Sequence, residues 1–270
     1  VGLGFVKWLT GAENLHYGLW NGLDAVAENT GRAQTAYTDK LFGYLPEGPL
    51  SILDIGGGAG ETARKLIALG HKVEIVVPSV VLAARCRANA PEAQVHEMTF
   101  EAFETDTRYD LCLFSESFQY IPLNIALGKA LELLKPGGHI LIADCFRSED
   151  FAPDRVTRTP GGGHPIADFR DQIAALPVET RKEEDITEAV APSIDLEQAL
   201  FHVFGDAVTR VETELAEKRP KSRWLLNRAL KMLMSRRRRN RLDIRLRGHE
   251  RTSAAFIKNN RYLITLLEKL

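Results

Sequence analysis

Glycine-rich turns between a strand and a helix are among the few sequence patterns that predict ligand chemistry. Within residues 53–66, LDIGGGAGETARKL, the glycines are Gly56, Gly57, Gly58 and Gly60. Glycine lacks a Cβ, so its backbone can take a positive φ and a ligand can approach it closely. A helix that begins near Glu61 would direct its free N–H groups to the same place. The turn predicts a site for a nucleotide-containing cofactor, and the alternative is a tight connection without a ligand.

Two cofactor patterns fit this turn. A GxGxxA pattern begins at Gly58 and is typical of dinucleotide sites, but those sites expect an acidic residue after the next strand, where Val77 stands. A DxGxGxG pattern begins at Asp54 and ends at Gly60 without a gap. This second pattern resembles the first motif of class I S-adenosylmethionine (SAM) dependent methyltransferases.

Three further segments support this resemblance. Residues 109–121, YDLCLFSESFQYI, predict a buried fourth strand followed by a loop. Residues 130–144, ALELLKPGGHILIAD, predict a helix, a Pro-Gly-Gly turn of the kind the family has, and a fifth strand. Residues 16–22, HYGLWNG, are similar to a segment of small-molecule methyltransferases related to cyclopropane fatty acid synthases and tocopherol methyltransferases. The resemblance covers about residues 10–190 and the final strand.

The resemblance implies which positions contact SAM. These are Asp54, Gly56, Gly57, Gly58, Gly60, Val77, Pro78, Ser79, Thr99, Phe100, Ser115, Glu116 and Tyr17. Val77 departs from the family, in which an acidic side chain holds the ribose hydroxyls. An unreplaced charge-assisted hydrogen bond there would cost about ten- to a hundredfold in affinity. Thr99 stands near the usual adenine contact, which is an aspartate in the family, and Ser79 is alternatively the N-cap of the next helix.

Methyl transfer needs alignment of the acceptor and exclusion of water, and a base only if the acceptor must lose a proton. The predicted catalytic residues are His164, Glu116 and Tyr17. His164, in the loop GGGHP, is the preferred base, and the alternative is an ordinary loop histidine. Glu116 is alternatively a helix cap, and Tyr17 a packing aromatic. The other candidates near this edge are Tyr120, His139 and His16, while Cys145 is expected to be a buried apolar side chain.

These residues require an α/β fold to bring them together. The 270 residues are 44% hydrophobic, enough for one full core. Alternating segments predict a doubly wound, mostly parallel seven-stranded sheet, a Rossmann-like methyltransferase fold. The predicted parts are a helical cap at 1–45, a SAM-binding core at 46–187, a helical insertion at 188–258 and a final strand at 259–270. The resemblance makes that strand antiparallel, although its periodicity also fits a helix.

The predicted insertion is strongly basic. Residues 218–247 contain thirteen Lys and Arg, including the run Arg236–Arg239, and a single acidic residue, Asp243, in a chain of net charge −1. Such asymmetry indicates an anionic acceptor, a lipid surface or nucleic acid, and the alternative is a solvated helix face. Apolar residues recur at helical spacing in two stretches, which predicts amphipathic helices: Val203, Phe204, Val208, Val211 and Leu215, then Trp224, Leu225, Leu230 and Leu233.

Composition narrows the location. Three cysteines without CxxC spacing argue against zinc and against a disulfide framework, so no metal is expected. No apolar run is long enough for a membrane span and no signal-peptide pattern is visible, which favours the cytoplasm. The chain begins at Val1 rather than Met, so residues upstream can be missing.

The sequence thus predicts a SAM-dependent methyltransferase that acts at O, N or C of a small, hydrophobic or anionic acceptor, with membrane-surface contact through the basic insertion. The alternatives from the same residues are a cyclase-like enzyme of this fold without methyl transfer, and a lipid- or nucleic-acid-binding protein with a vestigial nucleotide site. A dinucleotide oxidoreductase is the last alternative.

Overall fold

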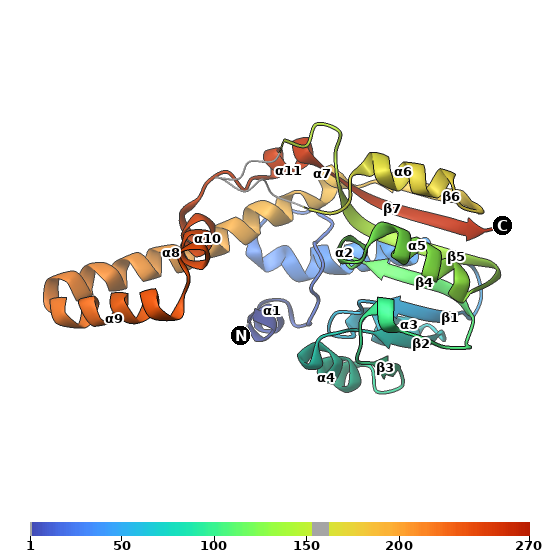
Figure 1. Ribbon diagram of the computed structural model, residues 1–270, viewed down its shortest axis with the longest axis horizontal. Helices are drawn as coiled ribbons and strands as arrows, with labels where there is room; N and C mark the ends of the chain where they lie inside the picture. Colours follow the sequence, from blue (N-terminus) through green and yellow to red (C-terminus); the bar gives the residue numbers. More distant parts are fainter. Residues whose placement is uncertain (1, 153–161) are drawn as a thin grey trace.

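The fold is built on one seven-stranded sheet with the order β3-β2-β1-β4-β5-β7-β6 (Figure 1). The computed structural model describes residues 2–152 and 162–270. All neighbours pair in parallel except β7, which is antiparallel to both β5 and β6. The predicted doubly wound sheet with an antiparallel final strand is therefore confirmed. The strands are β1 Ser51–Ile55, β2 Lys72–Val76, β3 Gln94–His96, β4 Tyr109–Ser115, β5 Leu134–Arg147, β6 Val178–Asp185 and β7 Asn260–Lys269.

Helices cover both faces of this sheet (Figure 1). The central strands β1 and β4 are almost wholly buried, which is why they read as continuous apolar runs rather than as alternating ones. Two buried clusters, one on each face, form the core. The helices after the strands are α3 Glu61–Ala68, α4 Val80–Asn89, α5 Leu123–Leu133 and α6 Ile166–Ala174, with short 3₁₀ turns η2 Phe100–Ala102 and η3 Phe118–Tyr120.

The amino-terminal cap is less helical than predicted. It contains α1 Gly2–Thr10, the 3₁₀ turn η1 Ala27–Asn29 and α2 Thr30–Phe42, while residues 11–26 are irregular. Gly11 and Gly22 have positive φ values of 79° and 71°, which a continuous right-handed helix does not allow. This irregular segment matters because it crosses the candidate site.

The Pro-Gly-Gly turn lies inside a strand. The predicted fifth strand at 139–145 extends from Leu134, so the turn residues form an irregular start of β5 rather than a separate connection. The pairing with β4 shifts register between Tyr109 and Leu111, and Gly137 has a φ of 70°. Five positions along β5, from Leu134 to His139, correspond to two along β4, so three extra residues of β5 form an irregular stretch before regular pairing resumes at His139.

The insertion forms a helical arm that projects from the α/β body (Figure 1). Its helices are α7 Thr187–Val190, α8 Pro192–Lys218, α9 Pro220–Leu233, α10 Arg236–Arg247 and α11 Ser253–Asn259. Among the described residues, no helix has both the length and the apolar character needed to cross a bilayer. Of the loop expected at 151–165, residues 153–161 lie outside the described part of the chain, as does the side chain of Leu230.

Candidate active site

The glycine turn forms one wall of a cavity of about 320 Å³ at the carboxyl ends of β1, β2 and β4. In this sheet the strand order reverses between β1 and β4, and ligands of open α/β sheets bind at such a switch point. The predicted cofactor positions that line this cavity are Asp54, Gly56, Gly57, Gly58, Val77, Pro78, Ser79, Ser115 and Glu116.

The turn needs glycine for two different reasons. Gly56 and Gly58 have φ values of 80° and 54°, where side chains with a Cβ are strained. At Gly57 a Cβ would lie 2.6 Å from Asp54 Oδ2, so the backbone there is packed against the carboxylate. Gly60, with a φ of 87°, is the N-cap of α3 and does not line the cavity. It acts by starting the helix.

Asp54 is a buried carboxyl, and one of its oxygens is without a hydrogen-bond partner in the described part of the chain. The residue is 1% exposed, and its Oδ2 has no hydrogen-bond partner among the described residues. Burial raises the pKa of Asp54 to about 7. Buried polar atoms in native proteins are almost always paired, so this oxygen calls for a donor or a cation in the cavity. The ammonium and sulfonium groups of SAM fit that requirement.

Residues 77–79, directly after β2, form another wall of this cavity. Val77 is 2% exposed and provides an apolar surface where the family has an acid. Ser79 lines the cavity and also accepts a hydrogen bond from the Leu82 N–H at 3.4 Å, so the N-cap interpretation is confirmed. Besides Asp54 and Glu116, the carboxylates that line this cavity are Glu13 from the cap and Glu61 from the start of α3.

Glu13 fastens the cap over the cavity. Its carboxylate accepts hydrogen bonds from Arg85 Nε at 2.8 Å, Arg85 Nη2 at 2.5 Å and Asn89 Nδ2 at 2.8 Å, while its N–H donates to Glu61 Oε1 at 3.2 Å. The bonds from Arg85 lower the pKa of Glu13 to about 2. This ion pair places the following residues, 14–16, between the cofactor cavity and a second one.

Glu116 lies where the two cavities meet. It is the one non-glycine residue with positive φ in the described chain, at 56°, directly after β4. Its Oε1 accepts hydrogen bonds from the Tyr17 N–H and the Tyr262 hydroxyl, each at 2.8 Å. Burial raises the pKa of Glu116 to about 8, and the charge of Asp144 acts in the same direction. Strained backbone and a raised carboxyl pKa in one residue are typical of functional positions.

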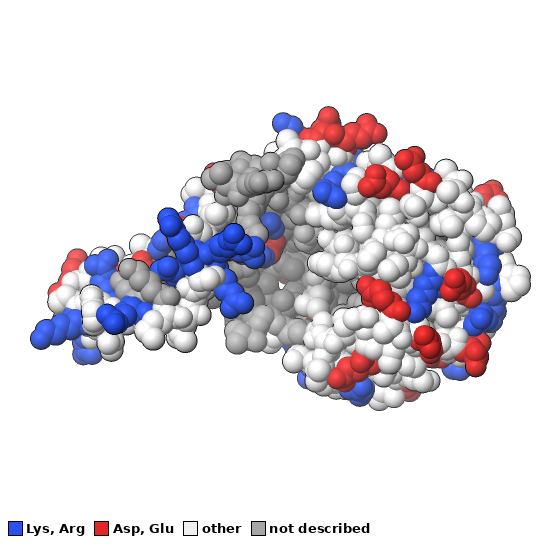
Figure 2. Space-filling view, viewed as in Figure 1, with Lys and Arg blue, Asp and Glu red and all other residues white. Residues whose placement is uncertain are grey.

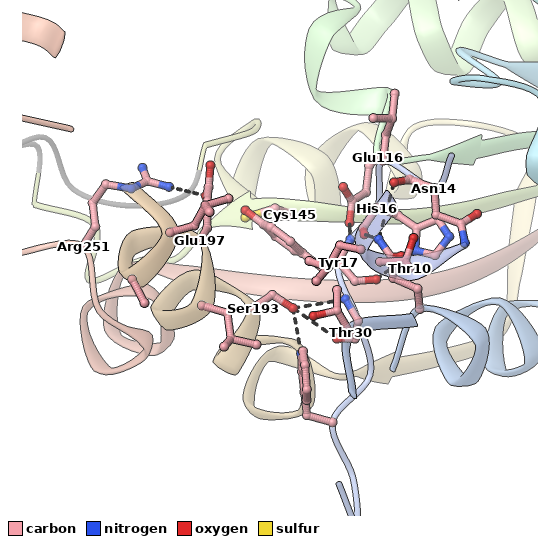
Figure 3. A pocket seen from close by; sticks show the side chains of 18 of the residues that line it. Thr10, Asn14, His16, Tyr17, Thr30, Glu116, Cys145, Ser193, Glu197 and Arg251 are labelled. Carbon is pink, nitrogen blue, oxygen red and sulfur yellow. Dashed lines mark hydrogen bonds and ion pairs between the residues drawn. The ribbon is translucent and has the colours of Figure 1, made fainter. Parts of the chain in front are cut away.

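The second cavity has a volume of about 710 Å³ and lies between the cap, the sheet edge and the arm. Tyr17 lines this cavity rather than the cofactor cavity, beside Cys145, Ser193 and Trp20 (Figure 3). Burial raises the pKa of Cys145 to about 12, so it remains a thiol as expected. The first turns of α8 contribute Leu196, Leu200 and Val203. The base of the insertion, at the start of α8, therefore forms one wall of this cavity.

Besides Gly60, three predicted residues line neither cavity. Phe100 is 3% exposed and packs edge-on against Phe114 at 5.8 Å in the core, and Thr99 is exposed beside it. The reason is that β3 ends at His96 and the chain turns along the outside of the sheet. His164 Nε2 lies 2.9 Å from the Ile121 carbonyl, so it is a donor, and His164 lines neither cavity. The preferred base of the sequence analysis is not supported.

Tyr120 lines both cavities, whereas the other histidine candidates and Asp144 have structural partners. His139 Nε2 is 3.5 Å from Glu268 Oε2 on the neighbouring strand β7. His16 donates from Nδ1 to the Tyr17 carbonyl at 2.8 Å, and burial lowers its pKa to about 4. Asp144 accepts from the Gln119 N–H at 3.1 Å and from Gln119 Nε2 at 2.9 Å, which fixes the loop after β4. Among the described residues no cluster of His, Cys, Asp and Glu is suited to a metal ion.

Several lining residues had no signal in the sequence. Glu13, Asn14 and Leu15 line the cofactor cavity. They directly precede the segment HYGLWNG that carries the family resemblance, and they match no motif themselves. The sequence indicates Glu61 only as the start of a helix. Glu197 and Arg251 line the second cavity, and nothing in their local sequence sets them apart from other charged residues.

Comparison with known proteins agrees with this geometry. The family described as "Methyltransferase domain" matches residues 26–172. An uncharacterized methyltransferase of Bacillus cereus is 27% identical over 124 residues, 44% of this chain and 58% of the relative. One of Bacillus anthracis is equally similar over the same shares. The chain thus spans a little over half the length of the curated relatives it matches.

Solved structures with this fold cover nearly the whole chain. A cyclopropane synthase from Mycobacterium tuberculosis superposes with a TM-score of 0.68 at 18% identity, covering 97% of this chain and 92% of the other. A geranyl diphosphate C-methyltransferase from Streptomyces coelicolor, in complex with Mg²⁺, geranyl diphosphate and S-adenosyl-L-homocysteine, has a TM-score of 0.66 at 14% identity, covering 100% and 93%. The cyclase SpnF has a TM-score of 0.64 at 17% identity, covering 98% and 92%.

These likenesses establish the fold, and the family match extends over more than half of the residues. The glycine turn and the strands β1 to β5 lie within the matched residues. This chain belongs to the methyltransferase-domain family.

Proposed function

We propose that the chain is a SAM-dependent methyltransferase that transfers a methyl group to the O, N or C atom of a small, mainly apolar acceptor. The observation that carries this proposal is the meeting of two cavities at Glu116. One has the glycine turn and the unpartnered Asp54 oxygen, and the other is larger and mostly apolar. Both are lined by Asn14, Leu15, His16, Glu116 and Tyr120.

The residues present fit SAM. Bound in the smaller cavity, SAM would supply a methyl group already activated by its sulfonium charge. Asp54 would face a cationic group, and the glycine turn would allow close approach to the methionine and ribose portions. Glu61, which is 12% exposed in its side chain and lines this cavity, is the carboxylate we assign to the ribose hydroxyls in place of Val77. A Glu61→Gln variant should lose about tenfold in SAM affinity.

The chain's own residues then position the acceptor and handle its proton. The cap segment at 14–16 and Tyr17 cover the junction of the cavities and exclude water, and orientation of this kind contributes roughly 7 to 11 kcal/mol to rate enhancements. Glu116, once ionised, can accept a proton from an O–H or N–H acceptor, because it lies at the junction. Tyr262 and the Tyr17 N–H hold its Oε1 in place.

The test is a calorimetric titration of the purified chain with SAM and separately with S-adenosylhomocysteine. We expect saturable one-to-one binding of both, followed by methyl transfer in a screen of small apolar acceptors. No heat and no thermal shift up to millimolar ligand would contradict the proposal. Binding without transfer to any acceptor would favour the cyclase-like alternative of the same fold.

We also propose that the basic arm contacts an anionic membrane surface. Large apolar side chains of α9 are exposed rather than packed: Trp224 by 61%, Leu225 by 63%, Met232 by 81% and Leu233 by 79%. Lys and Arg flank them in α9 and α10, and Figure 2 shows these cations gathered on the arm, where α8 also contributes acidic residues. Exposed apolar groups with flanking cations are the features of helices that lie in anionic membrane interfaces. A contact with nucleic acid would use the cations and would not require the exposed apolar side chains.

This contact can be measured by sedimentation with phosphatidylglycerol-containing vesicles and with pure phosphatidylcholine vesicles. We expect binding to the anionic vesicles alone, and loss of that binding in a Trp224→Ser, Leu225→Ser double variant. The matched control is Leu69→Ser with Val81→Ser, whose residues are 61% and 67% exposed on the body. Equal loss in the control, or binding to an oligonucleotide but not to vesicles, would contradict the proposed contact.

A further inference from the structure

Two arginines share one carboxylate at the edge of the larger cavity. Arg251 Nη2 donates to Glu197 Oε2 at 3.0 Å, and Arg245 Nη2 donates to Glu197 Oε1. Arg245 belongs to α10, Arg251 follows it, and Glu197 lies on the first turns of α8. Because a single carboxylate faces two guanidinium groups, this trio carries one positive charge that it does not compensate internally.

The rest of this cavity is uncharged near neutral pH. Its other described ionisable residues of low intrinsic pKa are His16 and Glu116. Burial lowers the pKa of His16 to about 4 and raises that of Glu116 to about 8, so both are predominantly neutral. The permanent charges of the lining are therefore concentrated at Arg245, Glu197 and Arg251.

This charged end lies away from the junction with the cofactor cavity. In Figure 3 Arg251 and Glu197 lie at one end of the pocket and Glu116 and His16 at the other, with Cys145 and Tyr17 between them. The Arg251 side chain is only 20% exposed, which strengthens its interaction with any anion that enters. The Arg245 guanidinium lies 4.3 Å from the centre of the Phe201 ring, which keeps it directed along the arm wall.

We infer that Arg251 and Arg245 form a subsite for an anionic group, a carboxylate or a phosphate, at the end of the acceptor remote from the methylated atom. The acceptor is then an amphiphile, with an apolar body in the cavity and an acidic head that contacts the two guanidinium groups in competition with Glu197. A guanidinium recognises such a head with two parallel hydrogen bonds. The orientation of this acceptor rests on the proposed methyl transfer, whereas the anion subsite itself does not.

Three probes of equal length separate charge from apolar contact: decanoate, decanamide and decylammonium. Each is titrated calorimetrically into the full chain, with and without S-adenosylhomocysteine. We expect decanoate to bind about tenfold more tightly than decanamide, the ratio for one additional charge-assisted hydrogen bond. Decylammonium should bind most weakly, because the subsite repels it.

Variants of the trio make opposite predictions. Arg251→Gln should weaken decanoate about tenfold and leave decanamide within twofold, and Arg251→Lys should give an intermediate loss because the charge remains without the fork. Glu197→Gln should instead tighten decanoate, since it removes the competing carboxylate. The matched control is Arg247→Gln at the end of α10, which pairs with Glu212 at 3.2 Å and with Asp243 and does not line the cavity.

The outcomes are decisive for each proposal separately. Equal binding of decanoate and decanamide, no binding of any probe, or equal effects of Arg251→Gln and Arg247→Gln would overturn the subsite. Discrimination for decanoate in a chain that fails to bind S-adenosylhomocysteine would uphold the subsite and overturn the methyltransferase proposal. A chain that binds S-adenosylhomocysteine but does not discriminate between decanoate and decanamide would overturn the subsite and uphold the methyltransferase proposal.

Discussion

Gly58 is the residue at which the cofactor site can be tested with least disturbance of the fold. A Cβ built there meets only Leu15 Cδ1, at 3.8 Å, so a side chain has space, and that space is the cofactor cavity. Gly57 and Gly60 differ, because a Cβ at either lies under 3.0 Å from neighbouring atoms. The three glycines of one motif thus have different structural roles.

Gly58→Leu is expected to reduce SAM affinity by at least a hundredfold while the chain stays folded. The strain at a φ of 54° costs about 1 to 2 kcal/mol of unfolding free energy. Gly70→Leu is the matched control, since its φ is 91°, nothing lies within 4 Å of its Cβ and it lines neither cavity. Calorimetry and urea unfolding measure both. Equal SAM affinity in the two variants would remove the basis of the assignment.

Glu116→Gln tests the proton acceptor at the cavity junction. The pKa of Glu116 is about 8, so the ionised fraction, and with it the rate of methyl transfer to an O–H or N–H acceptor, should rise as pH increases from 6 to 8. The variant should lower the rate about 10²- to 10⁴-fold and abolish that rise. Rates are measured at saturating SAM. An unchanged pH profile in Glu116→Gln would show that Glu116 carries no proton in the reaction.

At the scale of elements, the cap and α4 are joined by one ion pair. Glu13 lies in the irregular segment after α1, and Arg85 and Asn89 lie on α4. The next residues of the cap, at 14–16, line both cavities. The ion pair at Glu13 therefore holds the cap segment that covers the site to α4.

Arg85→Ala is expected to weaken SAM binding several-fold, although Arg85 lines neither cavity. Loss of its bonds to a carboxylate that is 5% exposed should lower the unfolding free energy more than loss of an exposed ion pair does. Arg87→Ala is the control on the same helix. Its pair with Glu97 is 50% and 34% exposed, and exposed pairs are worth 1 kcal/mol or less. Identical SAM affinity in Arg85→Ala would separate the cap from the site.

At the scale of the whole molecule, buried carboxyls set an unusual dependence of stability on pH. Burial raises the pKa of Glu116 to about 8 and those of Asp54 and Asp144 to about 7. Between their unfolded values near 4 and these folded values, the folded chain binds more protons than the unfolded chain. Stability contributed by these groups is therefore lost as pH rises.

Two groups act in the opposite direction at lower pH. The lowered pKa of Glu13, about 2, contributes stability above pH 4.5 that is lost as pH falls toward 2. The lowered pKa of His16, about 4, increases stability as pH rises from 4 to 6.5. Of these five groups, only the three buried carboxyls still change their protonation above pH 6.5. The melting temperature of the ligand-free chain should therefore fall from pH 6.5 to 8.

Thermal melts across this range measure the effect in the wild type and in Asp144→Asn. The variant removes one of the three carboxyls, so its melting temperature should fall less steeply. A wild-type melting temperature that rises over pH 6.5 to 8 would show that these carboxyls are ionised in the folded chain. Vesicle binding by the arm is also a property of the whole molecule, and it does not depend on the outcome of the thermal melts.

The sequence by itself determined the sheet and the cofactor turn. Runs such as 51–55 and 109–115 are apolar because both faces of a central parallel strand are buried. Glycine is required at positions 56 and 58 because φ is positive there. The apolar runs and the glycine positions are both local properties of the sequence. The final strand could be distinguished from a helix only through the family resemblance, since a strand buried on both faces has no alternating pattern.

The tertiary structure alone decided which side chains meet. Tyr17 and Glu116 are 99 positions apart, and Glu116 and Tyr262 are 146 apart, yet each pair is hydrogen-bonded. The raised pKa of Glu116 comes from burial that the cap and β7 create together. The trio of Arg245, Glu197 and Arg251 exists only because α8 and α10 return to the same cavity. Such contacts depend on the path of the whole chain, and no local pattern records them.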